Sequence, residues 1–240
     1  MGSSEDRFGA MRQPPSSDER VRPDGTDEPR RQERLSHIAP ALLIAGLVLA
    51  ALISVQYFDL AEERSQAEAV ALSESFIAAH NSRDYTKVRS MVAKAAEISM
   101  NPARSVDDLD MAMSWLEATG WTITSHGCTA TSGTSEEDPI HVFCSVAHEN
   151  AWSKAMGEEP DTRGGLALDI VSGEIATALL SPAPMSYAND AVTAFEAWLE
   201  ETHPDDLAKM YVYEDLPALT VESIELWSRH TNEFVEVERG

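Results

Sequence analysis

The sequence predicts an α+β protein in which one transmembrane helix precedes an antiparallel sheet covered by helices. Three observations lead to this prediction. Residues 38–58 contain no charged side chain. Four stretches between positions 121 and 180 read as strands, and the stretches before and after them repeat apolar residues at helical spacing. The order of helices, strands and helices favours an α+β class over alternating βα units.

The uncharged run is long enough to cross a membrane. A bilayer core of ~30 Å needs about 20 helical residues, and Tyr57 and Phe58 at the end of the run are typical interfacial anchors. A cleaved signal peptide is the alternative. The run is longer than a usual signal core, begins deep in the chain and has no clear small-residue cleavage site after it. We therefore expect residues 37–58 to form a transmembrane helix that anchors the protein in the membrane.

Charges on the two sides of this helix predict its orientation. Three arginines precede it, whereas three acids follow it with a single arginine nearby. Positive residues stay on the cytoplasmic side. We expect residues 1–36 to form a disordered cytoplasmic tail, because this Ser-, Pro- and Arg-rich stretch has few large apolar groups. Residues 59–66 are then a linker, and residues 67–240 an extracytoplasmic domain. The flanking charges are Arg30, Arg31 and Arg34 before the helix and Asp59, Glu62, Glu63 and Arg64 after it.

The domain beyond the helix is strongly acidic. The formal net charge of the chain is −23, and 33 acidic but only 11 basic residues lie at or after Asp59. Such a surface repels phosphate backbones and anionic lipid heads. We therefore expect no nucleic-acid partner, and solubility is the simpler reason for the charge.

Two cysteines fall in stretches that read as neighbouring strands. Cys128 and Cys144 lie symmetrically about position 136, and Gly133, Asp138 and Pro139 mark a turn between the strands. A hairpin folded there brings the two side chains together, and an oxidising compartment then favours a disulfide. The alternative is a pair of small buried thiols.

Helical patterns occupy both ends of the domain. The first begins near position 66, is broken at residues 81–84, and resumes through residue 92. A second follows Ser105 and ends at Gly120. After residue 190 a third repeats apolar residues on one stripe, Pro204 opens a fourth, and a fifth begins at Thr220.

The middle of the domain reads as a meander of strands. The expected strands cover residues 121–130, 140–147, 165–171 and 174–180, with a short helix at residues 151–156. Ser172 and Gly173 form a two-residue turn between the last two strands.

Three stretches carry a resemblance to a known superfamily. Residues 76–85 (FIAAHNSRDY) resemble a first-helix break, and residues 171–175 (VSGEI) resemble a strand, glycine turn and strand. Residues 195–206 (FEAWLEETHPDD), with the later SIELW and EFV segments, resemble the end of an uncharacterised actinobacterial, membrane-anchored subgroup. The domain thus resembles SnoaL-like members of the nuclear transport factor two-like (NTF2-like) superfamily. This resemblance implies a cone-like curved antiparallel sheet covered by helices, in a single-pass protein of the bacterial cell membrane.

The superfamily includes isomerases, dehydratases, binding modules and scaffolds, so fold alone does not decide function. Its enzymes place a carboxylate or histidine inside the cone. Asp169 and His141 are weak catalytic candidates here, beside His126 and His148, because each strand residue can equally face solvent. We expect no cofactor, since glycine-rich phosphate loops and nucleophile elbows are missing.

The histidines show no close metal-ligand spacing. His126, His141 and His148 lack a tight repeat such as His-x-x-x-His, so we expect no metal site among them. His203, directly before Pro204, is expected to cap a helix junction, and Trp198 and Trp227 to pack in the core.

These observations favour a membrane-anchored extracytoplasmic binding or scaffold module. Its expected partners are the membrane, through residues 37–58, and either a protein of a membrane complex or a small apolar ligand. The alternative is an isomerase- or dehydratase-like enzyme that acts on an apolar substrate in the cone. A cone filled by tryptophan and methionine side chains would argue against that alternative.

Overall fold

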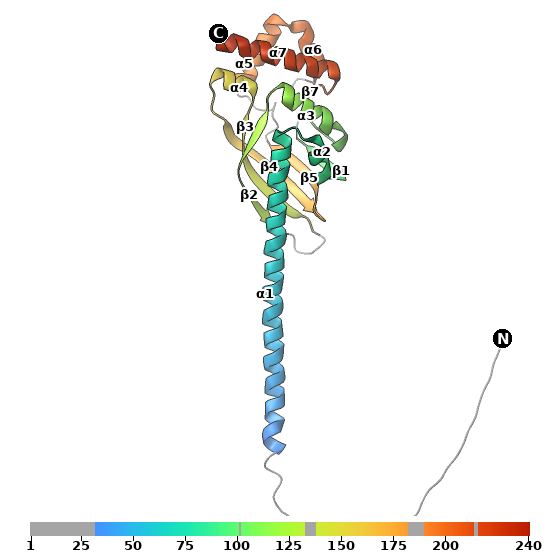
Figure 1. Cartoon of the computed structure of the whole chain (residues 1–240), viewed down its shortest axis with the longest axis vertical. Coiled ribbons are helices and arrows are strands. Elements are labelled where there is room, and N and C mark those ends of the chain that lie inside the picture. The colour runs from blue at the N-terminus through green and yellow to red at the C-terminus, as the bar shows by residue number, and fades with distance from the viewer. Residues whose placement is uncertain (1–31, 101, 133–137, 182–189, 214–215) are drawn as a thin grey trace, which may run out of the picture. The chain divides into compact units, whose positions relative to one another are not determined.

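The computed structural model describes residues 32–100, 102–132, 138–181, 190–213 and 216–240 (Figure 1). It divides into two compact units, Met1–Val55 and Gln56–Gly240, which we describe separately. Helix α1 (Gln32–Asn81) contributes residues to both units.

One helix is long and apolar enough to span a membrane. Its described apolar part lies within Leu43–Asn81 and reaches a mean hydropathy of 2.0, with none of that window buried. Residues 59–66, expected as a linker, are helical within α1. The structure thus agrees with a membrane-spanning helix by length and composition, whereas its orientation remains a prediction.

The second unit contains a five-stranded sheet in the order β1-β5-β4-β3-β2. Neighbouring strands are antiparallel from β2 to β5, as the sequence predicts. The prediction of a wholly antiparallel sheet is wrong at one edge, because β1 pairs with β5 in parallel. The strands are β1 (Val92–Ser99), β2 (Thr122–Thr131), β3 (Ile140–Glu149), β4 (Asp161–Val171) and β5 (Glu174–Ser181).

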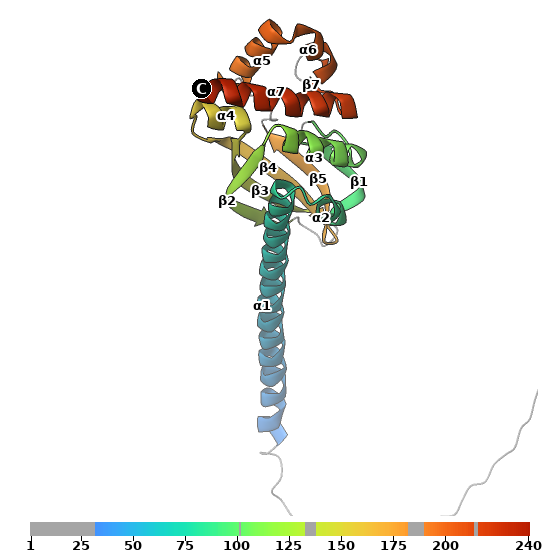
Figure 2. The same cartoon turned by 45° about the horizontal axis from the view of Figure 1, so that its top comes forward.

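The helices form layers at one end of this sheet. Figures 1 and 2 show α3 and α4 between the sheet and α7, with α5 and α6 on the far side of α7. The short strands β6 (Tyr211–Tyr213) and β7 (Leu216–Pro217) pair after α6. The remaining elements are α2 (Tyr85–Met91), the 3₁₀ turn η1 (Val106–Asp108), α3 (Leu109–Ala118), α4 (Ala151–Met156), α5 (Asp190–Thr202), α6 (Pro204–Met210) and α7 (Val221–Arg239).

Local signals place several of these elements. Asn150 and Ser153 form a capping box at the start of α4, and Gly157 ends that helix in the left-handed conformation. Ser172 and Gly173 both have positive φ, of 53° and 80°, which is the backbone of a type I′ hairpin turn. The predicted short helix at residues 151–156 and the predicted two-residue turn are therefore confirmed.

The break after α1 ties that helix to the edge of the sheet. The Asn81 side chain donates to the Ile123 carbonyl and accepts from the Ile123 amide, at 2.6 and 3.0 Å. It thereby pairs with β2, an edge strand with unused backbone groups. Arg83, with φ of 59°, donates to the carbonyls of His80, Leu116 and Trp121. The polar sequence at residues 81–84 therefore joins α1, α3 and β2.

Side chains alternate between the two faces of the sheet. On the inner face, Val142, Cys144 and Val146 of β3 are buried, as are Leu166 and Leu168 of β4. On the outer face, the apolar side chains are partly in solvent, with Phe143 54% and Leu179 44% exposed. The core thus lies between the inner face and the helices.

Cys128 and Cys144 are joined by a disulfide. They are direct partners in the β2–β3 register, with their Cα atoms 4.0 Å apart. The hairpin inferred from their symmetric positions therefore brings them together as predicted. Part of the loop between the strands, residues 133–137, lies outside the described residues.

Removal of this disulfide should destabilise the second unit. The bond closes a loop of 16 residues, so the chain-entropy model gives a loss of about 3 kcal/mol on reduction. Urea unfolding of the full chain in detergent, with and without dithiothreitol, measures this loss. The double variant Cys128→Ala, Cys144→Ala should match the reduced protein and show no further effect of dithiothreitol. Alkylation of both cysteines in unreduced, folded protein would contradict the prediction.

Candidate functional site

Large aromatic side chains fill the space between the sheet and α7. Trp115, Trp121, Trp152 and Trp227 are each 0–1% exposed. Trp152 of α4 stacks face to face with Phe195 of α5, with ring centroids 4.3 Å apart. The protein's own aromatic rings therefore fill this part of the interior.

Three of the four indole nitrogens in this cluster are hydrogen-bonded within the described residues, and Trp115 Nε1 has no partner there. Trp152 donates to the Thr231 hydroxyl at 3.2 Å, and Trp227 donates to the Met210 carbonyl at 3.2 Å. Buried polar groups cost free energy unless they are hydrogen-bonded. These bonds fix the rings of α4 and α7 in one packing and further favour a closed interior.

Two histidines are buried beside this interior. His80, near the end of α1, is 4% exposed, and His148 of β3 is 3% exposed. Burial, and secondarily the charge of Arg83, lowers the pKa of His80 to about 4. Burial also lowers the pKa of His148 to about 4, against a smaller opposite effect of Asp161. Both rings are therefore neutral near pH 7.

These lowered pKa values predict that the free energy of unfolding decreases as the pH falls below about 6.5. The folded state keeps each ring neutral down to pH 4, whereas the unfolded chain protonates near pH 6.5, so acid favours unfolding across that window. The loss should be on the order of 3 kcal/mol for each histidine by pH 4. Urea unfolding of the full chain, followed by tryptophan fluorescence at pH 7, 6, 5 and 4, measures it.

Matched variants separate this effect from other titrations. His80→Gln should reduce the pH dependence between 6.5 and 4, because it removes one of the two buried rings. His126→Gln is the control, since His126 is exposed at a register shift of β2. An unchanged slope in His80→Gln would refute the assignment.

The catalytic candidates proposed from the sequence lie on the outer face of the sheet. His141 and Asp169 are direct partners in the β3–β4 register, and His141 Nδ1 lies 2.6 Å from Asp169 Oδ1. Their side chains are 57% and 35% exposed. The structure thus brings His141 and Asp169 together, but on the face opposite the filled interior. His126 lies on β2 and is not part of this pair.

Two surface cavities lie near the helical layers. One, of ≈380 Å³, is bordered by His148, Asp161, Arg163 and other polar residues. The other, of ≈800 Å³, lies along α5, α6 and β6 and is bordered by Leu207 and Tyr213 among others. The polar lining of the smaller cavity does not fit an apolar substrate.

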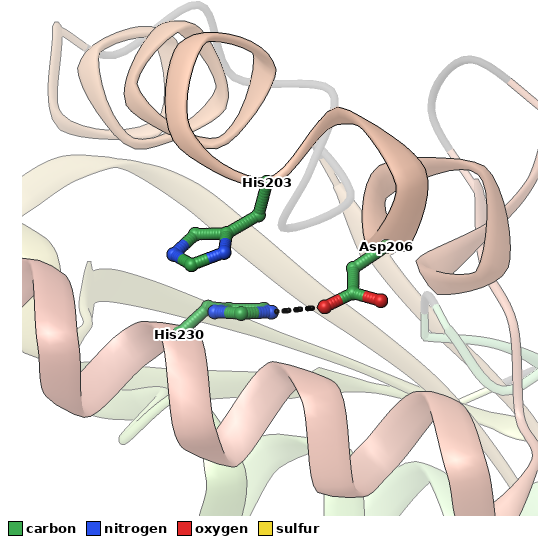
Figure 3. A group of neighbouring side chains, drawn as sticks. All are labelled: His203, Asp206 and His230. Atoms are coloured by element: carbon green, nitrogen blue, oxygen red, sulfur yellow. Dashed lines mark hydrogen bonds and ion pairs between the residues drawn. The ribbon is translucent and has the colours of Figure 1, made fainter.

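A cluster of two histidines and two carboxylates connects α6 and α7, and Figure 3 shows three of its members, His203, Asp206 and His230. His230 Nε2 lies 3.0 Å from Asp206 Oδ2, and His230 Nδ1 lies 2.9 Å from Glu233 Oε2. The same Glu233 oxygen lies 3.1 Å from His203 Nε2. The His203 and His230 rings have centroids 4.2 Å apart. We call these four residues the histidine–carboxylate cluster.

This cluster is anchored in the core. The His230 side chain is 1% exposed, and Asp206 in the first turn of α6 is 24% exposed. Trp198 of α5 contacts both histidine rings edge-on. The hydrogen bond from His230 lowers the pKa of Asp206, so this carboxyl is ionised near neutral pH.

The sequence reasoning did not identify this cluster. His203 is the residue before α6, as expected, but its side chain makes no capping hydrogen bond. The available signal is a pair of similar motifs, His203-x-x-Asp206 and His230-x-x-Glu233, each with its acid one helical turn after the histidine. Their joint position depends on how α6 and α7 pack, which the sequence does not reveal.

Comparisons with known proteins concern the fold. No protein-family model matches the chain, and no curated protein matches it in sequence. Among solved structures, a proposed polyketide cyclase from Xanthomonas campestris pv. campestris matches at 13% identity and a TM-score of 0.35, over 48% of this chain and 90% of that one.

Two further solved structures are similar to the same extent. A protein of unknown function from Mycobacterium tuberculosis matches at 12% identity and a TM-score of 0.41, over 56% of this chain and 91% of that one. An NTF2-like protein of unknown function from Cytophaga hutchinsonii matches at 12% identity and a TM-score of 0.32, over 45% of this chain and 84% of that one. At these identities and scores the matches carry no argument about the family or the activity of this chain.

Proposed function

We propose that this protein is a membrane-anchored, extracytoplasmic binding or scaffold module. The filled interior is the observation that carries this proposal, because four tryptophans between the sheet and the helices are 0–1% exposed, whereas the superfamily resemblance implies that an enzyme would hold its substrate inside the cone. The apolar helix supplies the anchor. The disulfide and the arginines before the helix both favour an extracytoplasmic domain.

The outer face of the sheet is the surface that we assign to a protein partner. Phe143 of β3 and Leu179 of β5 expose large apolar side chains there, in one cross-strand row with Ala167 of β4 between them. Exposed apolar groups on a sheet face are typical of protein interaction sites. His141 and Asp169, which share this face, then supply polar contacts rather than catalysis.

The catalytic candidates predicted from the sequence do not form a site that matches the isomerase- or dehydratase-like alternative. Its acid or base would have to face an apolar cavity, whereas His141 and Asp169 lie on the outer face. The neutral His148 borders a cavity, but that cavity is lined mainly by charged side chains. Neither arrangement favours proton transfer on an apolar molecule.

Native mass spectrometry of the full chain in detergent tests whether the interior is closed. The wild-type chain should retain no small apolar molecule, even after incubation with indole. Trp152→Ala should bind indole, because truncation of this buried side chain leaves a cavity of the ligand's own shape. A thermal melt confirms that the variant is folded. An apolar ligand retained by the wild type would support the enzyme alternative.

Cysteine labelling in intact cells tests the orientation of the domain. Thr162→Cys, at an exposed position of β4, should react with a membrane-impermeant maleimide in intact cells. Ser16→Cys in the N-terminal tail should react only after permeabilisation. The native cysteines give no background while they form the disulfide. The reverse labelling pattern would place the domain in the cytoplasm and contradict the proposal.

A further inference from the structure

We infer that the histidine–carboxylate cluster is a binding site for a divalent transition-metal ion, with zinc as the best-fitting ion. His203, His230 and Asp206 supply the ligand atoms, and Glu233 holds the two imidazoles in place. This site lies in the helical layer of α5–α7 and goes beyond the binding or scaffold role proposed above.

The first argument is the position of the protons. A neutral imidazole carries one N–H, on either Nδ1 or Nε2. Glu233 Oε2 lies 2.9 Å from His230 Nδ1, at hydrogen-bond distance, and 3.1 Å from His203 Nε2, as an ion pair. With the N–H of each neutral ring on the nitrogen next to Glu233, His203 Nδ1 and His230 Nε2 hold the lone pairs that can bind an ion. This one carboxylate therefore favours the same arrangement in both rings.

The second argument is what these lone pairs face. His230 Nε2 lies 3.0 Å from Asp206 Oδ2, so the imidazole nitrogen and the carboxylate oxygen face one another. Either a proton, as in a hydrogen bond, or a metal ion can join these two atoms. In Figure 3, one ring nitrogen of His203 and one of His230 lie on the side of Asp206. One ligand atom from each of the three residues lies within 4.8 Å of the others.

The third argument is the charge balance. The His203 and His230 rings have their centroids 4.2 Å apart, and the Asp206 and Glu233 carboxylates lie beside them. The two carboxylates carry a formal charge of −2, which one divalent ion neutralises. The burial of His230 at 1% exposure makes this neutralisation more important.

The donor set defines the class of ion. Two imidazole nitrogens and one carboxylate oxygen suit zinc and neighbouring transition metals, whereas calcium and magnesium prefer oxygen alone. Glu233 then has the role that carboxylates commonly have beside metal-bound histidines, since it accepts the N–H of the nitrogen opposite the metal. Three protein ligands leave a fourth position for water or for a side chain of a partner.

The test uses the full chain in detergent, without a polyhistidine tag and after treatment with a chelator. Cobalt(II) is the probe, because its visible d–d absorption reports coordination directly. We expect saturation at one cobalt ion per chain and displacement of the cobalt by zinc. The melting temperature should rise on binding, since a ligand of the folded state stabilises it.

Variants assign the bound ion to the cluster. His203→Gln and Asp206→Asn, at partly exposed positions, should each weaken cobalt binding by about tenfold or more. Near-UV circular dichroism verifies that both variants keep the tryptophan packing. His141→Gln is the matched control, because it breaks a second histidine–aspartate pair on the outer face of the sheet. It should leave the binding constant and spectrum unchanged.

Three outcomes would overturn the inference. Absence of saturable binding by the folded wild type would mean that protons alone neutralise the cluster. Unchanged binding in His203→Gln and Asp206→Asn would place the ion elsewhere. Loss of binding in His141→Gln alone would assign it to the outer face of the sheet.

Discussion

Burial of the indole rings between the sheet and α7 is the constraint on which the rest of the second unit depends. An indole buries a large apolar area but still needs a partner for its N–H. Here the partners of Trp152 and Trp227 are Thr231 and the Met210 carbonyl, which belong to the last helix and to the end of α6. The core is therefore complete only when α6 and α7 are in place, and the cooperativity of the unit extends to its C-terminal helix.

The packing of the indole rings also determines which other side chains of α7 are buried against neighbouring helices. Trp227 and Phe234 occupy its buried stripe, and His230 lies between them at helical spacing with 1% of its side chain exposed. A histidine at such a position has to satisfy two ring nitrogens within the helical layer. It does so through Asp206 and Glu233, so the polar cluster is a direct consequence of how α7 packs.

Sequence patterns predicted the elements whose signals are local. The short helix at residues 151–156, the turn at Ser172 and Gly173 and the pairing of Cys128 with Cys144 were all predictable, because each depends on residues close in sequence or on a single hairpin. Strand β1 was not predictable. Its residues, VAKAAEIS, are rich in Ala, Lys and Glu, which favour helix, and its burial does not alternate cleanly. Parallel pairing with β5 overrides that local preference. The histidine–carboxylate cluster was missed for the same kind of reason, since its halves are separated along the chain and meet only through helix packing.

A closed interior also changes where function can reside in this fold. Where rings fill the core, a ligand can meet the protein only at its surface, and the second unit offers two chemically distinct surfaces. The outer sheet face combines exposed Phe143 and Leu179 with an ion pair, which suits a protein partner. The layer of α5–α7 instead holds two imidazoles that both lie next to the Glu233 carboxylate. A cation in that layer would bridge α6 to α7, the two elements that complete the tryptophan core. Occupancy of the cluster and closure of the interior should therefore be coupled, because both depend on the same packing of α6 against α7.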